Sequence, residues 1–178
     1  MEKKNVTAWV IWFTGISASG KTTLGTLVKK ELEKKYKIVE MLDGDVTRHF
    51  FENDLGYSEN DRMTSLKRIM FGAALVAKNG VPTVVACITP TYQMRNLVRK
   101  KITKYIEIYC KASIEKVMER DPKGHYAKYK LGKLHHVIGL DDKYDIPRHP
   151  DLICETDIET VEESFSKIKN LLSKKGIL

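Results

Sequence analysis

Residues 10–25, VIWFTGISASGKTTLG, decide the fold of this chain. An apolar run ends at Gly15, small residues follow, and a second glycine, a lysine and two threonines come next. From Gly15 to Thr22 the sequence matches G-x-x-x-x-G-K-[ST] at every specified position. A plain glycine turn is the alternative, but the pattern lies between an apolar run and a helical one, the context of phosphate-binding loops. The stretch therefore predicts a nucleotide site.

The loop residues have separate expected tasks. Glycines let successive backbone N–H groups surround phosphate oxygens, and the helix that starts near Lys21 adds the positive end of its dipole. Lys21 is expected to reach the β- and γ-phosphates of ATP, and the Thr22 hydroxyl to ligate Mg²⁺. The residues expected to bind ATP are Gly15, Ile16, Ser17, Ala18, Ser19, Gly20, Lys21, Thr22 and Thr23.

Apolar bursts alternate with helical periodicity along the chain. The bursts expected to form strands are residues 8–14 (AWVIWFT), 37–42 (KIVEML), 81–88 (VPTVVACI), 105–110 (YIEIYC) and 151–155 (DLICE). Helical stripes are expected at Leu24, Val28 and Leu32, at Ile69, Ala73 and Val76, and at Val161, Phe165, Ile168, Leu171 and Leu172. The alternation predicts an α/β fold of the P-loop NTPase type, a parallel β-sheet with helices on both faces and ligands at the carboxyl ends of the strands.

Length and composition fit one compact domain over residues 1–178. Apolar residues make up 42%, charged residues 30%, and the net charge is +8. Such a charge fits nucleic-acid proteins, solvated lysine-rich surfaces and enzymes of polyanions alike. Three widely spaced cysteines, Cys87, Cys110 and Cys154, argue for buried packing in a reducing compartment. No stretch is long enough to span a bilayer, so we expect a cytoplasmic protein without membrane contact.

Residues 120–150 differ from the rest of the chain. They are polar, basic and punctuated by glycine, with little strand character. A plain loop of this length is uncommon in an α/β domain, so we expect a mobile lid that orders over bound nucleotide.

A second candidate site follows the expected second strand, in LDGDVTR at residues 42–48. Asp43 and Asp45 flank a glycine at the carboxyl end of that strand, near the phosphates in this architecture. One carboxylate can belong to the magnesium shell, and another can accept the proton of an acceptor hydroxyl that attacks the γ-phosphoryl group. The alternative is an Asp-Gly turn in which Asp45 caps the next helix. Beside the phosphate loop, the catalytic interpretation is favoured.

The segment DLGYSENDR, residues 54–62, places Tyr57 and Arg62 in a polar loop and helix start, with Ser58 as the expected N-cap. An aromatic ring and an arginine can stack on a base and pair with an anion. A solvated loop fits the composition equally well.

Together these residues resemble the adenylylsulfate kinase family over nearly the whole chain. The shared features are the glycine loop, LDGD followed by Arg48, DLGYS..DR, a proline turn with Arg95 and Arg99, RDPKGHY (120–126), and GLDDKYDIP (139–147) before HPDLI (149–153). Many nucleotide enzymes have the glycine loop, whereas DLG-aromatic-S and RDPKG-x-Y are more specific. The resemblance implies Mg²⁺-dependent transfer of the ATP γ-phosphate to the 3′-hydroxyl of adenosine 5′-phosphosulfate (APS), a step of sulfate assimilation.

The resemblance also assigns roles in phosphoryl transfer. Asp45 becomes the base and a metal-shell carboxylate, with Asp43 in support. Lys123 in the lid closes over the reacting phosphates, and Arg120 lies near the ATP base. Dimers are common in the resembled family, so a homodimer is one expected assembly.

On the acceptor side, the resemblance implies that Arg48 and Arg62 bind the phosphosulfate and sugar region. It implies that Tyr57 stacks on the adenine of the acceptor.

Four positions depart from the family pattern. Val46 and Ser65 stand where the family has asparagines, Tyr92 replaces an arginine of the proline turn, and Val137 replaces an aromatic that would sandwich the adenine. All four bear on the acceptor pocket. Thr89 stands at a family serine, but direct in-line transfer needs no phosphorylated intermediate, so we assign it no catalytic role.

Two other functions fit parts of this sequence. One is a kinase of the same fold for another nucleotide-like acceptor, such as a cytidine diphosphoramidate. The other is a nucleotide switch or nucleic-acid-binding ATPase, which is disfavoured because the chain has no N-K-x-D signature and its basic residues are scattered without aromatic platforms. No nucleic-acid partner is therefore expected. Adjacent His135 and His136 make a poor chelating pair, so no zinc site is expected either.

Overall fold

The computed structural model describes residues 7–178, which form a sheet of five parallel strands. The strands are β1 (Val10–Thr14), β2 (Glu40–Asp43), β3 (Thr83–Ala86), β4 (Tyr105–Lys111) and β5 (Leu152–Glu155). Their order across the sheet is β2-β3-β1-β4-β5, which puts β1 in the centre. Each strand overlaps one of the expected apolar bursts, so the predicted parallel α/β fold is confirmed.

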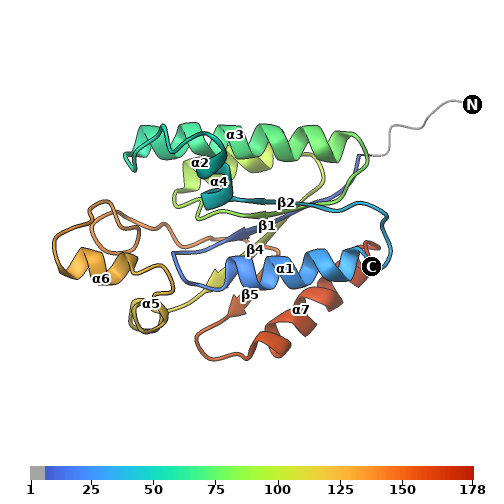
Figure 1. Cartoon of the computed structure of the whole chain (residues 1–178). Coiled ribbons are helices and arrows are strands. Elements are labelled where there is room, and N and C mark those ends of the chain that lie inside the picture. Colours follow the sequence, from blue (N-terminus) through green and yellow to red (C-terminus); the bar gives the residue numbers. More distant parts are fainter. Residues whose placement is uncertain (1–6) are drawn as a thin grey trace, which may run out of the picture.

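Helices cover both faces of this sheet. They are α1 (Lys21–Leu32), α2 (Gly44–Phe50), α3 (Glu59–Lys78), α4 (Tyr92–Lys101), α5 (Ile114–Arg120), α6 (His125–Lys130) and α7 (Val161–Lys174). Figure 1 shows α3 and α4 on one face and α1 and α7 on the other, which gives the expected three layers. None of the helices in residues 7–178 combines the length and the apolarity needed to cross a membrane.

The central strand β1 is buried on both faces because successive side chains of a strand point in opposite directions. Ile11 and Phe13 pack against apolar residues of α1 and α7, whereas Val10 and Trp12 pack against those of α3 and α4. Each fully buried side chain of this size contributes about 1.5–3 kcal/mol to the free energy of unfolding. The rigid strand between two cores gives the following loop a fixed base.

The expected helical stripes mostly face these cores. Leu24, Val28 and Leu32 of α1 are buried, as are Ile168 and Leu172 of α7.

Val161 was expected in the α7 core stripe, and this prediction was wrong. Its side chain is 43% exposed. It is the first residue of α7 and lines a cleft at that end of the helix, so the sheet does not cover it.

The segment 120–150 has more structure than its composition suggested. It contains α6 and a β-bridge between Ile138 and Asp142. Tyr126, Val137 and Ile138 are buried together with Ile16 of the loop after β1. The segment therefore rests on that loop through a small apolar core of its own. In Figure 1 it projects from one end of the sheet.

Candidate active site

The phosphate loop, residues 15–22, joins β1 to α1 and depends on glycine at two positions. Gly15 has a φ of 146°, and a Cβ there would lie 2.5 Å from the carbonyl oxygen of Cys110. Gly20 has a φ of 89° and is the N-cap of α1. The first N–H groups of α1 lack intrahelical acceptors, and no described side chain caps them. They are therefore available to an anion.

Lys21 lies inside this loop and is only 9% exposed. Its Nζ donates a hydrogen bond of 2.6 Å to the carbonyl oxygen of Ile16, across the loop. Burial lowers the pKa of the Lys21 ammonium because desolvation penalises the charged form. A phosphate beside it would offset that penalty, so the loop and its lysine suit a polyanion.

The two aspartates after β2 have different partners. Asp43 Oδ2 accepts a hydrogen bond of 2.8 Å from the Thr22 hydroxyl, and Asp43 Oδ1 accepts one of 2.9 Å from the backbone N–H of Asp45. Asp43 is thus the N-cap of α2, whereas the alternative weighed from sequence gave that role to Asp45. The Asp45 carboxylate instead forms an ion pair with Lys123. One carboxylate therefore faces the phosphate loop and the other faces the lid.

The predicted acceptor residues also come together. The guanidinium groups of Arg48 and Arg62 lie 4.7 and 5.3 Å from the centre of the Tyr57 ring. Arg48 Nη1 donates 3.0 Å hydrogen bonds to the carbonyl oxygens of Leu55 and Gly56, which fixes the loop before α3. Ser58 caps α3 through the N–H of Asp61, as expected.

Arg62 joins this loop to the lid. Its Nε donates to the carbonyl oxygen of Tyr57 at 3.0 Å, and its Nη2 donates to the carbonyl oxygen of His136. Burial lowers the pKa of Arg62, and Asp142 opposes the shift from 3.9 Å. The guanidinium thus bridges two sides of the cleft.

The lid also contacts the phosphate loop directly. Tyr126 is buried, and its hydroxyl donates a hydrogen bond of 3.1 Å to the carbonyl oxygen of Ser17. Arg120, at the end of α5, donates to the carbonyl oxygens of Thr156 and, at 3.4 Å, Ala18. It therefore joins the phosphate loop to the loop after β5.

These residues surround one cleft of about 1100 Å³ at the carboxyl edge of the sheet. Its walls include Asp43, Asp45, Arg48, Tyr57, Arg62, Arg120 and Lys123, and from the phosphate loop and the start of α1 Ser17, Ala18, Gly20, Lys21, Thr22 and Thr23. The structure thus brings most of the predicted catalytic, ATP-binding and acceptor-binding residues to one cleft. Gly15, Ile16 and Ser19 do not line it, since Ile16 packs in the lid core and Ser19 is buried.

Some lining residues were not predicted. They come from the loop after β3, the lid, the loop after β5 and the start of α7, namely Cys87, Ile88, Thr89, Pro90, His135, His136, Thr156, Glu159, Thr160, Val161 and Ser164. For the residues that follow β3 and β5, the position after a parallel strand was a usable signal.

Among residues 7–178 there is no group of three or more His, Cys, Asp or Glu side chains placed to hold a metal on their own.

Thr89 makes two hydrogen bonds through its side chain. Its hydroxyl accepts one of 2.9 Å from the Trp12 indole and donates one of 3.2 Å to the carbonyl oxygen of Cys87. Because both hydrogen bonds are made within the protein, the Thr89 hydroxyl has a structural role.

Comparison with known proteins identifies the family. The family model described as adenylylsulphate kinase matches residues 7–155, most of the chain. The chain belongs to the adenylylsulfate kinase family. It is therefore an ATP-dependent phosphotransferase with a P-loop kinase fold.

Relatives of known name agree over the full length. The adenylyl-sulfate kinase of Halothermothrix orenii is 39% identical over 98% of this chain and 95% of its own. That of Rippkaea orientalis is 39% identical over 100% of this chain and 97% of its own. A solved structure of the Mycobacterium tuberculosis APS kinase in complex with AMPPNP and APS is 35% identical, with a TM-score of 0.86 over 94% of this chain and 98% of its own.

The same fold extends to more distant kinases. Shikimate kinase from Aquifex aeolicus is 14% identical to this adenylylsulfate kinase family member, with a TM-score of 0.57 over 94% of this chain and 98% of its own. This likeness concerns the fold alone.

Proposed function

We propose that this chain transfers the γ-phosphate of ATP to the 3′-hydroxyl of APS, giving 3′-phosphoadenosine 5′-phosphosulfate for sulfate assimilation. One observation carries the proposal: the phosphate loop and the Asp45–Tyr57–Arg62 side open onto the same cleft in a member of this family. A cleft of about 1100 Å³ is large for one small ligand, and nucleotide-sized ligands are typical of such sites.

On the donor side, the loop residues 15–23 bind the ATP phosphates through backbone N–H groups, and Lys21 holds the β- and γ-phosphates. Arg120 and the loop after β5 lie on the side where the nucleoside of ATP extends. Thr156 in that loop and Val161 at the start of α7 line the cleft there and offer a polar and an apolar contact to it.

The residues present fit a magnesium ion that arrives with ATP. The Thr22 hydroxyl and the Asp43 carboxylate lie 2.8 Å apart and are hard oxygen ligands of the kind that Mg²⁺ prefers. These two groups would hold the ion, with Asp45 as a further carboxylate in its shell. When bound, Mg²⁺ neutralises charge on the phosphate oxygens. We therefore propose Asp43 as the main carboxylate ligand of Mg²⁺, whereas the resemblance implied Asp45.

Asp45 acts as the base that accepts the proton of the acceptor hydroxyl. Its carboxylate is 59% exposed to the cleft and pairs with Lys123. Lys123 exchanges this carboxylate for phosphate oxygens when ATP is present, which leaves Asp45 to the acceptor. Both groups lie on the cleft wall.

On the acceptor side, Tyr57 stacks on the adenine, and Arg48 and Arg62 bind the phosphosulfate and the sugar region. Base–aromatic stacking of this kind contributes about 1–3 kcal/mol. Val137 is 7% exposed and belongs to the lid core, so its side chain offers little surface to a second base face.

Acceptor competition tests the proposal. Purified protein with Mg²⁺ and ATP is assayed with APS and, in parallel, with a cytidine diphosphoramidate. We expect turnover with APS at a kcat/KM at least about tenfold higher, the effect of about 1.4 kcal/mol of differential binding. Turnover of the cytidine compound alone would overturn the proposal.

We further propose a homodimer in the cytoplasm, with neither nucleic acid nor membrane as a partner. The dimer rests on the family resemblance. A hexameric APS kinase from Thiobacillus denitrificans, 25% identical over 98% of this chain and 30% of its own with a TM-score of 0.72, supports assembly of several copies in general. The cysteines of this chain are free thiols, two of them buried, which suits a reducing compartment. Light scattering after size-exclusion chromatography measures the assembly directly.

A further inference from the structure

Arg95 on α4 is a buried arginine that the proposed reaction does not use. Arg95 is only 4% exposed to solvent. Its Nη1 donates a hydrogen bond of 2.8 Å to the carbonyl oxygen of Thr89, and its Nη2 donates to the carbonyl oxygen of Asp145. The two acceptors lie 56 residues apart in sequence (145 − 89) but on either side of one guanidinium. This planar fork holds two chain segments at a fixed separation.

The first segment is the turn after β3, which forms part of the cleft wall through Ile88, Thr89 and Pro90. Thr89 has a φ of 46°, a backbone conformation that non-glycine residues adopt only when the surroundings enforce it. The Trp12 indole holds its side chain, and Arg95 holds its carbonyl group. The turn is therefore kept in shape from two sides.

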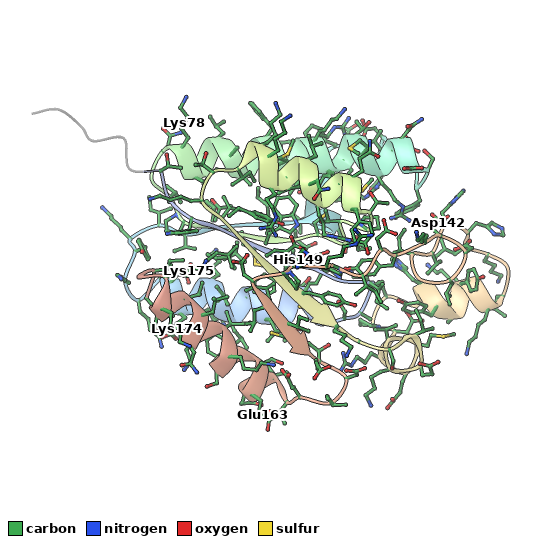
Figure 2. The ribbon with its side chains drawn as sticks, turned by 180° about the vertical axis from the view of Figure 1, so that it is seen from behind. Lys78, Asp142, His149, Glu163, Lys174 and Lys175 are labelled. Atoms are coloured by element: carbon green, nitrogen blue, oxygen red, sulfur yellow. The ribbon has the colours of Figure 1, made fainter. Side chains whose placement is uncertain are left out.

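The second segment is the part of the chain that returns from the lid to β5. In Figure 2 it runs from Asp142 at the lid end toward His149 beside the sheet. Asp145 lies on this path. Its N–H donates to the carbonyl oxygen of Pro90 at 2.9 Å, and its carboxylate accepts from the N–H of Tyr92 at 3.0 Å. Arg95 adds the third link between the returning chain and the turn.

A buried carboxylate balances the charge of Arg95. Glu107 of β4 is 3% exposed; its Oε1 lies 3.8 Å from Arg95 Nε, and its Oε2 accepts from Arg99 Nη2 at 2.8 Å. The Arg99 side chain is 47% exposed and makes its other hydrogen bond, of 3.4 Å, to the carbonyl oxygen of His149. Arg99 thus shares the counter-ion of Arg95 without contacting the cleft turn.

We propose that Arg95 is a positioning residue that ties the acceptor side of the cleft wall to the root of the lid. The inference rests on the proposed kinase function for its consequences in turnover. By holding the Thr89 and Asp145 carbonyl groups together, Arg95 makes the cleft turn and the returning chain move as one unit. The acceptor then meets a wall that is already in place when the lid closes.

Arg95→Lys tests the proposal, with Arg99→Lys as the matched control. Lysine keeps the charge but cannot span both carbonyl groups with a planar fork. We expect the KM for APS to rise up to about tenfold, because APS binding must then order a wall that one charge-assisted hydrogen bond no longer holds, while the KM for ATP changes less than about twofold. Arg99→Lys should leave both values near those of the unmodified protein.

Glu107→Gln separates positioning from charge balance. Arg95→Met removes both carbonyl links and leaves Glu107 partly unbalanced, so it should lower the Tm as well as raise the KM for APS. Adding Glu107→Gln should restore much of the Tm but not the KM. Recovery of both together would reduce Arg95 to a counter-ion and overturn the proposal, as would equal effects of the two lysine variants.

Trp12 offers a readout that does not need turnover. Its indole donates to the Thr89 hydroxyl, so its emission reports the state of the turn in a Trp9→Phe background. Arg95→Lys should change this emission more than Arg99→Lys, because Arg99 reaches Trp12 only through the Tyr105 ring and has no contact with Thr89. If the unmodified protein failed to phosphorylate APS, the proposed function would fall. The Trp12 comparison would still decide the role of Arg95, and an unchanged emission in Arg95→Lys would refute it.

Discussion

The donor and acceptor sides of the cleft differ in how they hold a ligand. The phosphate loop uses backbone N–H groups, two glycines and a lysine that is 9% exposed. The acceptor side uses partly exposed side chains, with the guanidinium groups of Arg48 and Arg62 lying 4.7 and 5.3 Å from the centre of the Tyr57 ring. A backbone site requires a fixed chain path and tolerates few sequences, whereas a side-chain site can change residue by residue. Of the four positions that depart from the family pattern, Val46, Ser65 and Val137 line the cleft, whereas Tyr92 does not.

This comparison makes the two sides separable by mutation. Changes in the phosphate loop should alter ATP binding, and changes on the acceptor side should alter the KM for APS alone. Asp45 lies between them and should affect the rate of transfer.

The largest effect is expected for Asp45→Asn. Removal of a general base typically lowers kcat by about 10²–10⁴-fold. The affinity for Mg·ATP should stay within a few-fold, since Asp43 and Thr22 remain. Steady-state kinetics and calorimetry measure the two quantities. Asp54→Asn is the control, because Asp54 pairs with Arg68 outside the cleft. If Asp45→Asn mainly abolished ATP binding, Asp45 would have a structural role instead.

Gly15→Ala should damage the donor side alone. Its Cβ would lie 2.5 Å from both the Cys110 carbonyl oxygen and the Ser19 hydroxyl, so the loop must shift. Overpacking costs about 1–3 kcal/mol, which weakens ATP binding about 10- to 100-fold. Gly132→Ala is the control, since Gly132 also has a positive φ but has nothing within 4 Å of an added Cβ. Equal losses in the two variants would show that strain, rather than the clash, matters.

Tyr57→Ala should damage the acceptor side alone. Loss of the stacking ring should raise the KM for APS about tenfold or more. The affinity for ATP should not change, because Tyr57 has no contact with the phosphate loop in the described contacts. Tyr57→Phe retains the ring and serves as the control. A parallel loss of ATP affinity in Tyr57→Ala would break the separation of the two sides.

Tyr126→Phe should have the smallest effect and concerns the link between lid and phosphate loop. It removes one hydrogen bond of 3.1 Å to Ser17 while keeping the buried ring. A neutral hydrogen bond contributes about 0.5–1.5 kcal/mol net, so ATP affinity should fall only a few-fold.

Hydrogen exchange on the unmodified protein tests the mobility of the lid. It should show the backbone amides of α6 more protected with nucleotide than without it. The same protection in both states would contradict a mobile lid.

Much of the donor side could be predicted from the sequence because local patterns encode it. Buried parallel strands are continuous apolar runs, and the glycine pattern specifies its own backbone path. The strands and the loop were therefore found near their true positions. The N-cap of α2 is harder to predict from the sequence, because Asp43 and Asp45 are equally good capping residues and only the residue at which the helix begins decides between them.

The rest of the site depends on contacts between distant segments. No local signal places Thr156 beside Arg120 or the His136 carbonyl group beside Arg62. The lid is polar in composition because Tyr126 is separated from Val137 and Ile138 by a basic stretch, and these residues form a core only after the chain folds back on the phosphate loop.

The strand order has a further consequence. Because β1 is central, β2 and β3 lie on one side of it and β4 and β5 on the other. The residues proposed for the acceptor follow β2, and those proposed for the nucleoside of ATP follow β4 and β5, so the two proposed subsites lie on opposite flanks of the central loop. Substitutions on one flank can therefore change the preference for one substrate while the contacts to the other stay the same.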